Sequence, residues 1–246
     1  MKKIKLLILF VLIAACNADE NCLKSSGEAV SETFYTDAFH TIDIPQGVDV
    51  ELVQADDFKV IIQSFKNRIK QIQPQVQDSV LRIENNNNCN LIHREKSAKI
   101  TIHTPVLTTI KSRTQFRVFS TDTLKFPALF IISSLPENSA SSEIDLILDN
   151  QSVSVEDNSV AFFKLSGKTA HLMVSLYGGS SAVDAKNLVA DGVSFYHRSS
   201  NDIHLYPLNF IEGQLLSTGN AILYNKPDAV EISSTYKGKI EYRDLP

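Results

Sequence analysis

Residues 199–242 read SSNDIHLYPLNFIEGQLLSTGNAILYNKPDAVEISSTYKGKIEY. This stretch repeats one short pattern, in which a turn of small polar residues precedes a strand of alternating apolar and polar residues. The copies are NDIHL at 201–205, NAILY at 220–224 and GKIEY at 238–242. Their central apolar residues, Ile203, Ile222 and Ile240, are 19 and 18 residues apart. Alternation with a period of two is typical of β-strands, and a fixed repeat length is typical of stacked repeats.

The same pattern occurs earlier, as SEIDL at 142–146 and SAVDA at 181–185. Ile144 and Val183 are 39 residues apart, about two repeats, and NSVAFFKL at 158–165 lies between them. One coil of this length cannot bury its own apolar side chains, whereas stacked coils about 4.8 Å apart bury them in columns. The spacing therefore predicts an all-β fold, a β-helix-like solenoid of stacked short strands. A β-sandwich, whose strands need not share one period, is the alternative.

The first half of the chain also alternates, in HTIDIPQGVDVELVQ at 40–54, SVLRIEN at 79–85 and AKITIHTPVL at 98–107. Turn-forming residues separate these runs, which therefore read as short strands. After the N-terminal segment, apolar residues nowhere recur at helical spacing over three turns. We therefore expect residues 33–246 to form one solenoid domain without a long helix.

The N-terminus, MKKIKLLILFVLIAAC, has the order of a bacterial export signal. Lysines lead, and the apolar run at 6–15 is shorter than the roughly 20 residues that span a bilayer as a helix. IAAC at 13–16 resembles a lipobox. We therefore expect residues 1–15 to be removed, Cys16 to be lipidated and residues 16–32 to form a tether. Ordinary cleavage, with Cys16 as a bystander, is the alternative.

These features predict a cell-envelope protein, an outer-membrane lipoprotein held to the membrane by the lipid on Cys16. The acidic pair at 19–20 is typical of export to the cell surface in some diderm bacteria. Without the three lysines of residues 1–15, the formal charge of −4 becomes −7. Nucleic-acid binding relies on Lys and Arg that neutralise phosphates, so nucleic acid is not an expected partner.

Three cysteines occur, and lipidation of Cys16 leaves Cys22 and Cys89. Disulfides persist outside the cytoplasm, so we expect a bridge between these two. It would join the tether to the turn NNNNCN at 85–90 and, from loop entropy, stabilise the fold by about 4 kcal/mol. The sequence has no Cys-x-x-Cys and no histidines at i, i+4, so no metal site or other cofactor is expected.

The stretch SFYHRSSNDIH at 194–204 gathers a histidine, an arginine, hydroxyl groups and an acid. Alternation along a strand puts His197 on the face opposite Arg198. Asn201 and Asp202 are typical of a turn closed by side-chain to backbone hydrogen bonds. No nucleophile elbow accompanies the serines, so no catalytic residue is assigned. His197, Arg198, Asn201 and Asp202 are candidate ligand contacts.

Two acids suggest an alternative function. Asp145 and Asp184 occupy the same repeat position about two coils, or roughly 9 to 10 Å, apart, and Glu241 shares their register. Glycosidases use two carboxylates about 5 to 9.5 Å apart, so a carbohydrate-active β-helix enzyme, a lyase or hydrolase, is the alternative. Alternating polar residues on a solvent face explain the acids equally well.

Aromatic residues recur through the repeats and offer flat apolar faces, most of them with a hydroxyl group. They either line a binding strip or pack between coils. The residues are Tyr177, Phe195, Tyr196, Tyr206, Tyr224, Tyr236 and Tyr242.

The motifs together resemble those of a family of exported bacterial adhesins named for its head-GIN domain. The resemblance rests on FHTIDIPQGVDVELVQ (39–54), VLRIENNNNCN (80–90), AKITIHTPVLTTIKSR (98–113), FYHRSSND (195–202), LLSTGNAILYNKP (215–227) and YKGKIEY (236–242). It implies a β-helix-like fold and brings no catalytic residues. SSTYKGK at 233–239 stands where the family's turns typically read SGSG, which bears on the turn types.

We therefore expect a non-catalytic cell-envelope lipoprotein, an adhesin or binding module for a glycan or protein ligand. The carbohydrate-active enzyme is one alternative. An envelope structural protein whose solenoid stacks on itself is the other.

Overall fold

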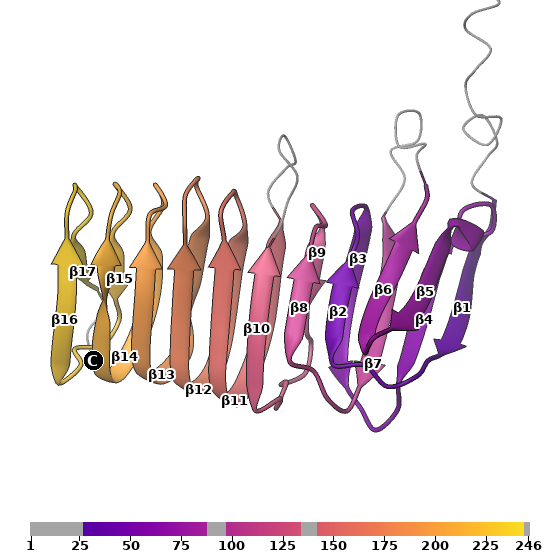
Figure 1. Ribbon diagram of the computed structural model, residues 1–246, viewed down its shortest axis with the longest axis horizontal. Coiled ribbons are helices and arrows are strands. Elements are labelled where there is room, and N and C mark those ends of the chain that lie inside the picture. The colour runs from indigo at the N-terminus through magenta and orange to yellow at the C-terminus, as the bar shows by residue number, and fades with distance from the viewer. Residues whose placement is uncertain (1–26, 88–96, 134–141, 244–246) are drawn as a thin grey trace, which may run out of the picture.

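The computed structural model describes residues 27–87, 97–133 and 142–243. They form an elongated stack of 17 strands, seen in Figure 1 as a front row and a back row. The predicted β-solenoid is confirmed, with about six turns, and the sandwich alternative is wrong. Cys16, Cys22 and Cys89 lie outside the described residues, so the lipidation and the disulfide stay predictions.

The described part of the chain begins with short strands. These are β1 (Ala29–Tyr35), β2 (Thr41–Ile44), β3 (Val48–Gln54), β4 (Lys59–Phe65), β5 (Ile72–Gln77), β6 (Val80–Asn85), β7 (Ala98–Thr104), β8 (Thr109–Ser112) and β9 (Arg117–Phe119). A 3-10 helix, η3, spans Ile69–Gln71.

The second part contains the regular coils. Its strands are β10 (Ala128–Ser133), β11 (Glu143–Asp157), β12 (Phe162–Leu176), β13 (Ala182–His197), β14 (Ile203–Leu215), β15 (Ala221–Leu223), β16 (Ala229–Ser234) and β17 (Ile240–Tyr242). The long strands β11 to β14 bend midway, so that their first halves pair in one row and their second halves in the other.

The core consists of columns in which each coil contributes one side chain. One column is continuous through the row that contains the first halves of β11 to β14, because successive strands in this row pair residue to residue. It runs Ile62, Ile100, Val50, Val118, Ile144, Phe163, Val183, Ile203, Ala221 and Ile240. All but the last, Ile240, have no exposed surface. Stacking therefore buries what no single coil covers.

The register corrects the repeat alignment at one position. Ile203 pairs with Ala221, and Ile222 pairs with His204. Ala221, Ile222 and Leu223 are all buried, so this short strand does not alternate. The most hydrophobic residue of NAILY therefore did not mark the stacking position.

The first half of the chain stacks out of sequence order. The β2 strand lies between β6 and β8, and β3 lies between β7 and β9 (Figure 1). A coil from an early part of the sequence thus lies between two coils from later parts of the sequence. Alternation alone does not predict this order, because it assigns faces to residues and not neighbours to strands.

Antiparallel strands close the N-terminal end of the stack. The β1 strand pairs with β4 and β4 with β7, while β5 pairs with β6. Because β1 begins at Ala29, it includes residues 29–32, which the sequence pattern assigned to the tether. Phe39 meets Phe58 edge-on at 5.2 Å between ring centroids, and Ile69 of η3 is buried beneath this end.

We expect Gly167→Ala to destabilise the fold by about 3 kcal/mol or more, since large losses follow backbone overlap of this kind. Gly167 pairs with Leu148 of the preceding coil. Its φ is +103°, and an added Cβ would lie 2.0 Å from the Leu148 carbonyl oxygen. Urea unfolding followed by circular dichroism measures the change.

The matched control is Gly27→Ala. Gly27 also has a positive φ, +83°, but a Cβ added there would lie no closer than 3.4 Å to its nearest neighbour, the Lys66 Cβ. Strain alone predicts a loss of about 1 kcal/mol there. Equal losses in the two variants would show that coil contact at Gly167 is not what matters.

Candidate functional site

The residues predicted at 194–204 lie on the corner between β13 and β14 but do not converge on one point. His197 is completely buried and faces the interior, whereas Arg198 is exposed. Asn201 donates its side-chain N–H to the Ser180 carbonyl at 2.5 Å, and Asp202 accepts from the Asn220 backbone N–H at 2.8 Å.

These bonds connect neighbouring coils, whereas the sequence predicted that Asn201 and Asp202 would close their own turn. Ser199 closes it by accepting from the Asn201 N–H at 3.3 Å, and its hydroxyl also donates to the Ser181 carbonyl of the preceding coil at 2.6 Å. The corner is therefore a hydrogen-bonded row along the stack. Among the four candidate ligand contacts, Arg198 and Asn201 are exposed, and the side-chain amide of Asn201 is held by the Ser180 carbonyl.

His197 sits in a column near the turns, between Leu176 and Leu215 of the adjacent coils. Neither ring nitrogen makes a well-aligned hydrogen bond within the described residues. Burial lowers the pKa of His197 to about 4, with partial opposition from the backbone of Asn201 and the carboxylate of Asp202. The imidazole is therefore neutral at physiological pH and serves as a core side chain.

We expect acid to destabilise the protein through His197. The unfolded chain binds a proton near the ordinary pKa of 6.5 and the folded chain only near 4. Protons therefore favour unfolding across this range, and the loss as pH falls from 6.5 to 4 is on the order of 3 kcal/mol. His197→Leu, which matches its column neighbours, should remove this loss in urea titrations at pH 7.5 and 4.5.

His40→Gln, at an exposed histidine, is the control and should keep the acid sensitivity of the wild-type chain. If His197→Leu retains the full loss of stability in acid, His197 is not its source.

The shared register of the two acids, Asp145 and Asp184, is confirmed, and both acids form ion pairs. Asp145 and Asp184 both pair with Lys164 of the coil between them. Asp145 contacts Arg117 and lies 3.2 Å from the Lys164 Nζ, while Asp184 lies 3.2 Å from the Lys186 Nζ. A glycosidase nucleophile needs a carboxylate that is free to reach the sugar ring, and the two cations beside Asp145 do not favour that role.

The aromatic residues do not form one strip. Tyr177 and Tyr196 lie together at 5.7 Å between centroids, on the row formed by the second halves of the strands. Tyr224 lies on the other row, where its hydroxyl contacts the His204 Nδ1 at 2.9 Å. Phe195 is in the core, with 5% of its surface exposed. Because side chains alternate along a strand, the adjacent residues Phe195 and Tyr196 lie on opposite faces.

A shallow groove crosses the outer face of β12, β13, β14 and β16. Two rows of outward residues line it, each aligned by strand pairing. They are Met173, Ser194, Glu212 and Glu231 in one row, and Ser175, Tyr196, Gln214 and Ser233 in the other. The groove thus places an aromatic face and a thioether beside amide, hydroxyl and carboxylate groups.

The carboxylates of this groove differ from Asp145 and Asp184. Glu212 and Glu231 pair directly in adjacent strands. Glu212 accepts from the Ser194 hydroxyl at 2.8 Å. Within the described part of the chain, neither glutamate has a lysine or arginine partner. Their oxygen atoms remain accessible to a ligand.

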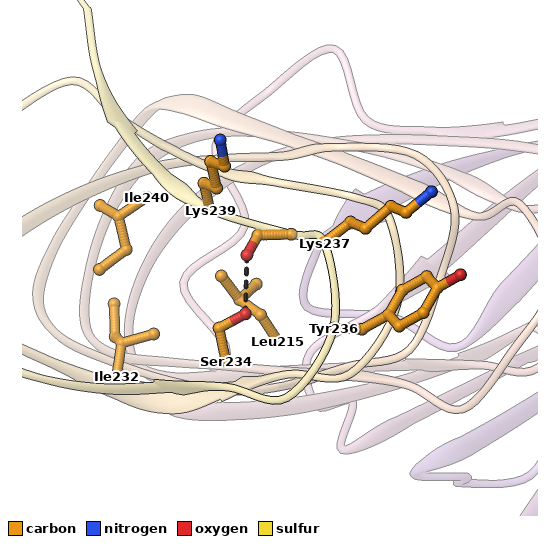
Figure 2. A pocket seen from close by; sticks show the side chains of 8 residues that line it. Leu215, Ile232, Ser234, Tyr236, Lys237, Lys239 and Ile240 are labelled. Carbon is orange, nitrogen blue, oxygen red and sulfur yellow. Dashed lines mark hydrogen bonds between the residues drawn. The ribbon is translucent and has the colours of Figure 1, made fainter.

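A second hollow lies at the C-terminal end of the stack, between β16 and β17. Figure 2 shows Ile232 and Ile240 facing each other across it, with Leu215 to one side of them, next to Ser234. Lys237, Lys239 and Tyr236 stand at its rim. The end of the core is thus partly open.

No group of three or more metal-ligating side chains occurs within residues 27–87, 97–133 and 142–243. In the same ranges, no helix is long and apolar enough to cross a membrane.

An elongated solenoid that presents rows of varied side chains on its outer face is a scaffold suited to binding. The family model described as "Putative auto-transporter adhesin, head GIN domain" matches residues 38–227, and the chain belongs to this family. The family resemblance of the sequence motifs is thereby confirmed.

Solved structures share the fold. A "putative adhesin" from Bacteroides fragilis NCTC 9343 is 20% identical, with a TM-score of 0.77 over 88% of this chain and 97% of that chain. A "putative adhesin" from Parabacteroides distasonis ATCC 8503 is 16% identical, with a TM-score of 0.68 over 88% and 98%.

A "putative lipid binding protein" from the same Parabacteroides strain is 14% identical, with a TM-score of 0.65 over 89% and 98%. A search of curated proteins found no match.

Sequence reasoning missed the groove residues Met173, Glu212, Gln214 and Glu231, as well as Lys237 and Lys239. The groove residues alternate with apolar core residues along their strands, and this alternation could have assigned them to the outer face. Their convergence depends on the coil register, which crosses irregularities between Ala185 and Val189 and between Ala190 and Gly192.

Proposed function

We propose that this chain is a non-catalytic binding module of the cell envelope, which holds a glycan across the groove over β12, β13, β14 and β16. The observation that carries the proposal is the pair of aligned outward rows, in which Tyr196 lies beside Glu212 and Glu231, two carboxylates without a cationic partner among the described residues. The adhesin descriptions of the family and of the structural relatives support a binding role.

The groove chemistry suits a sugar chain. A tyrosine ring offers a flat apolar face to the C–H side of a sugar ring. Carboxylate oxygens accept hydrogen bonds from sugar hydroxyls, and the Gln214 amide both donates and accepts. The coil spacing of about 4.8 Å repeats these groups along the stack, which matches a linear ligand better than a compact one.

A glycan array probed with the purified full chain in detergent tests the function. We expect Tyr196→Ala to weaken binding to the retained glycan about tenfold, because the aromatic contact is worth on the order of 1 kcal/mol. Tyr206→Ala is the matched control, since Tyr206 lies on β14 and pairs with Val189, away from the groove. Titration calorimetry measures both.

An array on which no glycan is retained would sink the glycan proposal. Equal losses for both tyrosine variants would place the site elsewhere. The enzyme alternative predicts turnover of a retained glycan that Asp145→Asn abolishes; the ion pairs of Asp145 favour binding without turnover.

We further propose that lipid on Cys16 anchors the chain in the outer membrane, with the solenoid on the cell surface. The support is IAAC at 13–16 behind an apolar run. A single acyl chain binds a membrane only marginally, whereas two or more anchor it stably.

Cys16→Ser should leave the precursor uncleaved and without incorporated labelled palmitate. Protease added to intact cells should digest the wild-type solenoid. A Cys16→Ser chain that is still processed and acylated would contradict the anchor, and full protection from protease would contradict the surface location.

A further inference from the structure

The C-terminal end of the stack has free strand edges. The β16 strand pairs with β14 and β17 pairs with β15, and neither has another neighbour among the described residues. Thr235 donates its backbone N–H to the Leu215 carbonyl at 3.0 Å, and Arg243 donates to Leu223 at 3.0 Å.

Backbone groups of alternate residues in a strand point to the same side. Ile232 lies three residues before Thr235, and Ile240 lies three residues before Arg243. Because three is an odd number, the backbone groups of both isoleucines point away from the preceding coil, to the open edge. Each edge therefore offers N–H and C=O groups to a further strand.

The hollow between these strands continues the core column. Ile240 is the last member of the column, and it is half-buried where its counterparts are fully buried. Leu215, Ile232 and Ile240 form an apolar floor (Figure 2). Val230, on β16, is 40% exposed. A further strand would cover this floor as each coil covers the one before it.

The opposite end of the stack has edges of another kind. Its edge strands are β1 and β5, each antiparallel to its neighbour, and β5 contains Pro74, which has no N–H to donate. This makes end-to-end stacking of C-terminal onto N-terminal ends unfavourable. The free C-terminal edge therefore calls for a different occupant.

Charge indicates which occupant fits. Lys237 and Lys239 stand at the rim, and neither has a carboxylate partner within the described residues. Lys237 lies over the Tyr236 ring at 5.7 Å from its centroid. Two copies joined through this end would bring four ammonium groups together, whereas an acidic segment would neutralise them.

We propose that the C-terminal edge binds an extended, acidic polypeptide segment of a partner protein by strand addition to β16. The segment's backbone pairs with the edge groups of Val230 and Ile232, and its apolar side chains cover Ile232 and Ile240. Its carboxylates meet Lys237 and Lys239. Strand addition draws affinity from the backbone and selectivity from alternate side chains.

The probe is a synthetic peptide that alternates valine and serine over the length of the 6 residues of β16 and ends in two glutamates, which lie past Ser234 toward Lys237 and away from Glu231. It is added to the purified full chain in detergent. We expect saturable binding by calorimetry and slower hydrogen exchange at 229–234. The same peptide with methylated backbone nitrogens should not bind. Lys237→Glu combined with Lys239→Glu should weaken binding at least tenfold.

Lys111→Glu combined with Lys125→Glu makes the same charge change on exposed lysines of earlier coils and should leave binding unchanged. Circular dichroism checks that all variants fold. Failure of the unmethylated peptide to bind, equal binding of the methylated peptide, or equal loss in both lysine pairs overturns the proposal. A dimer in sedimentation that the Lys237→Glu and Lys239→Glu changes disrupt would make a second copy the occupant and also overturn it.

Discussion

The in-register pairing of each coil with the next is the constraint on which the rest of this structure depends. It aligns one side chain per coil into columns such as the one from Ile62 to Ile240, and it buries them without any coil having a core of its own. The same closeness leaves no space for a Cβ at Gly167, beside the Leu148 carbonyl. Backbone pairing therefore decides both where apolar residues and where glycines are required.

This constraint separates the inside of the solenoid from the outside. Inside, even a histidine is held neutral, because burial outweighs the nearby Asp202 carboxylate. Outside, the register sets charges side by side, with different results on the two rows. Asp145 and Asp184 flank Lys164, whereas Glu212 and Glu231 adjoin each other with no cationic partner in the described part of the chain. The second arrangement leaves hydrogen-bonding capacity for a ligand, and our functional proposal rests on it.

The same constraint treats the two ends differently. Antiparallel strands and Pro74 close the N-terminal end, since they remove the parallel edge that a further coil needs. At the other end β16 and β17 have edges that no other described strand covers, together with an apolar floor. Each coil of a solenoid can pair with a further coil, so stacking ends only where the terminal strands differ from the regular coils.

The sequence by itself determined the all-β class, the repeat near 20 residues, and the face of most residues, because alternation is a local property of a strand. It correctly set His197 opposite Arg198 and placed Asp145 and Asp184 in one register. Only the tertiary structure decided which strands are neighbours. The enclosure of β2 and β3 by later strands, the pairing of Ile203 with Ala221, and the meeting of Tyr196 with Glu212 and Glu231 depend on contacts between residues far apart in sequence. Such contacts follow from register and bulges, which a local pattern does not encode.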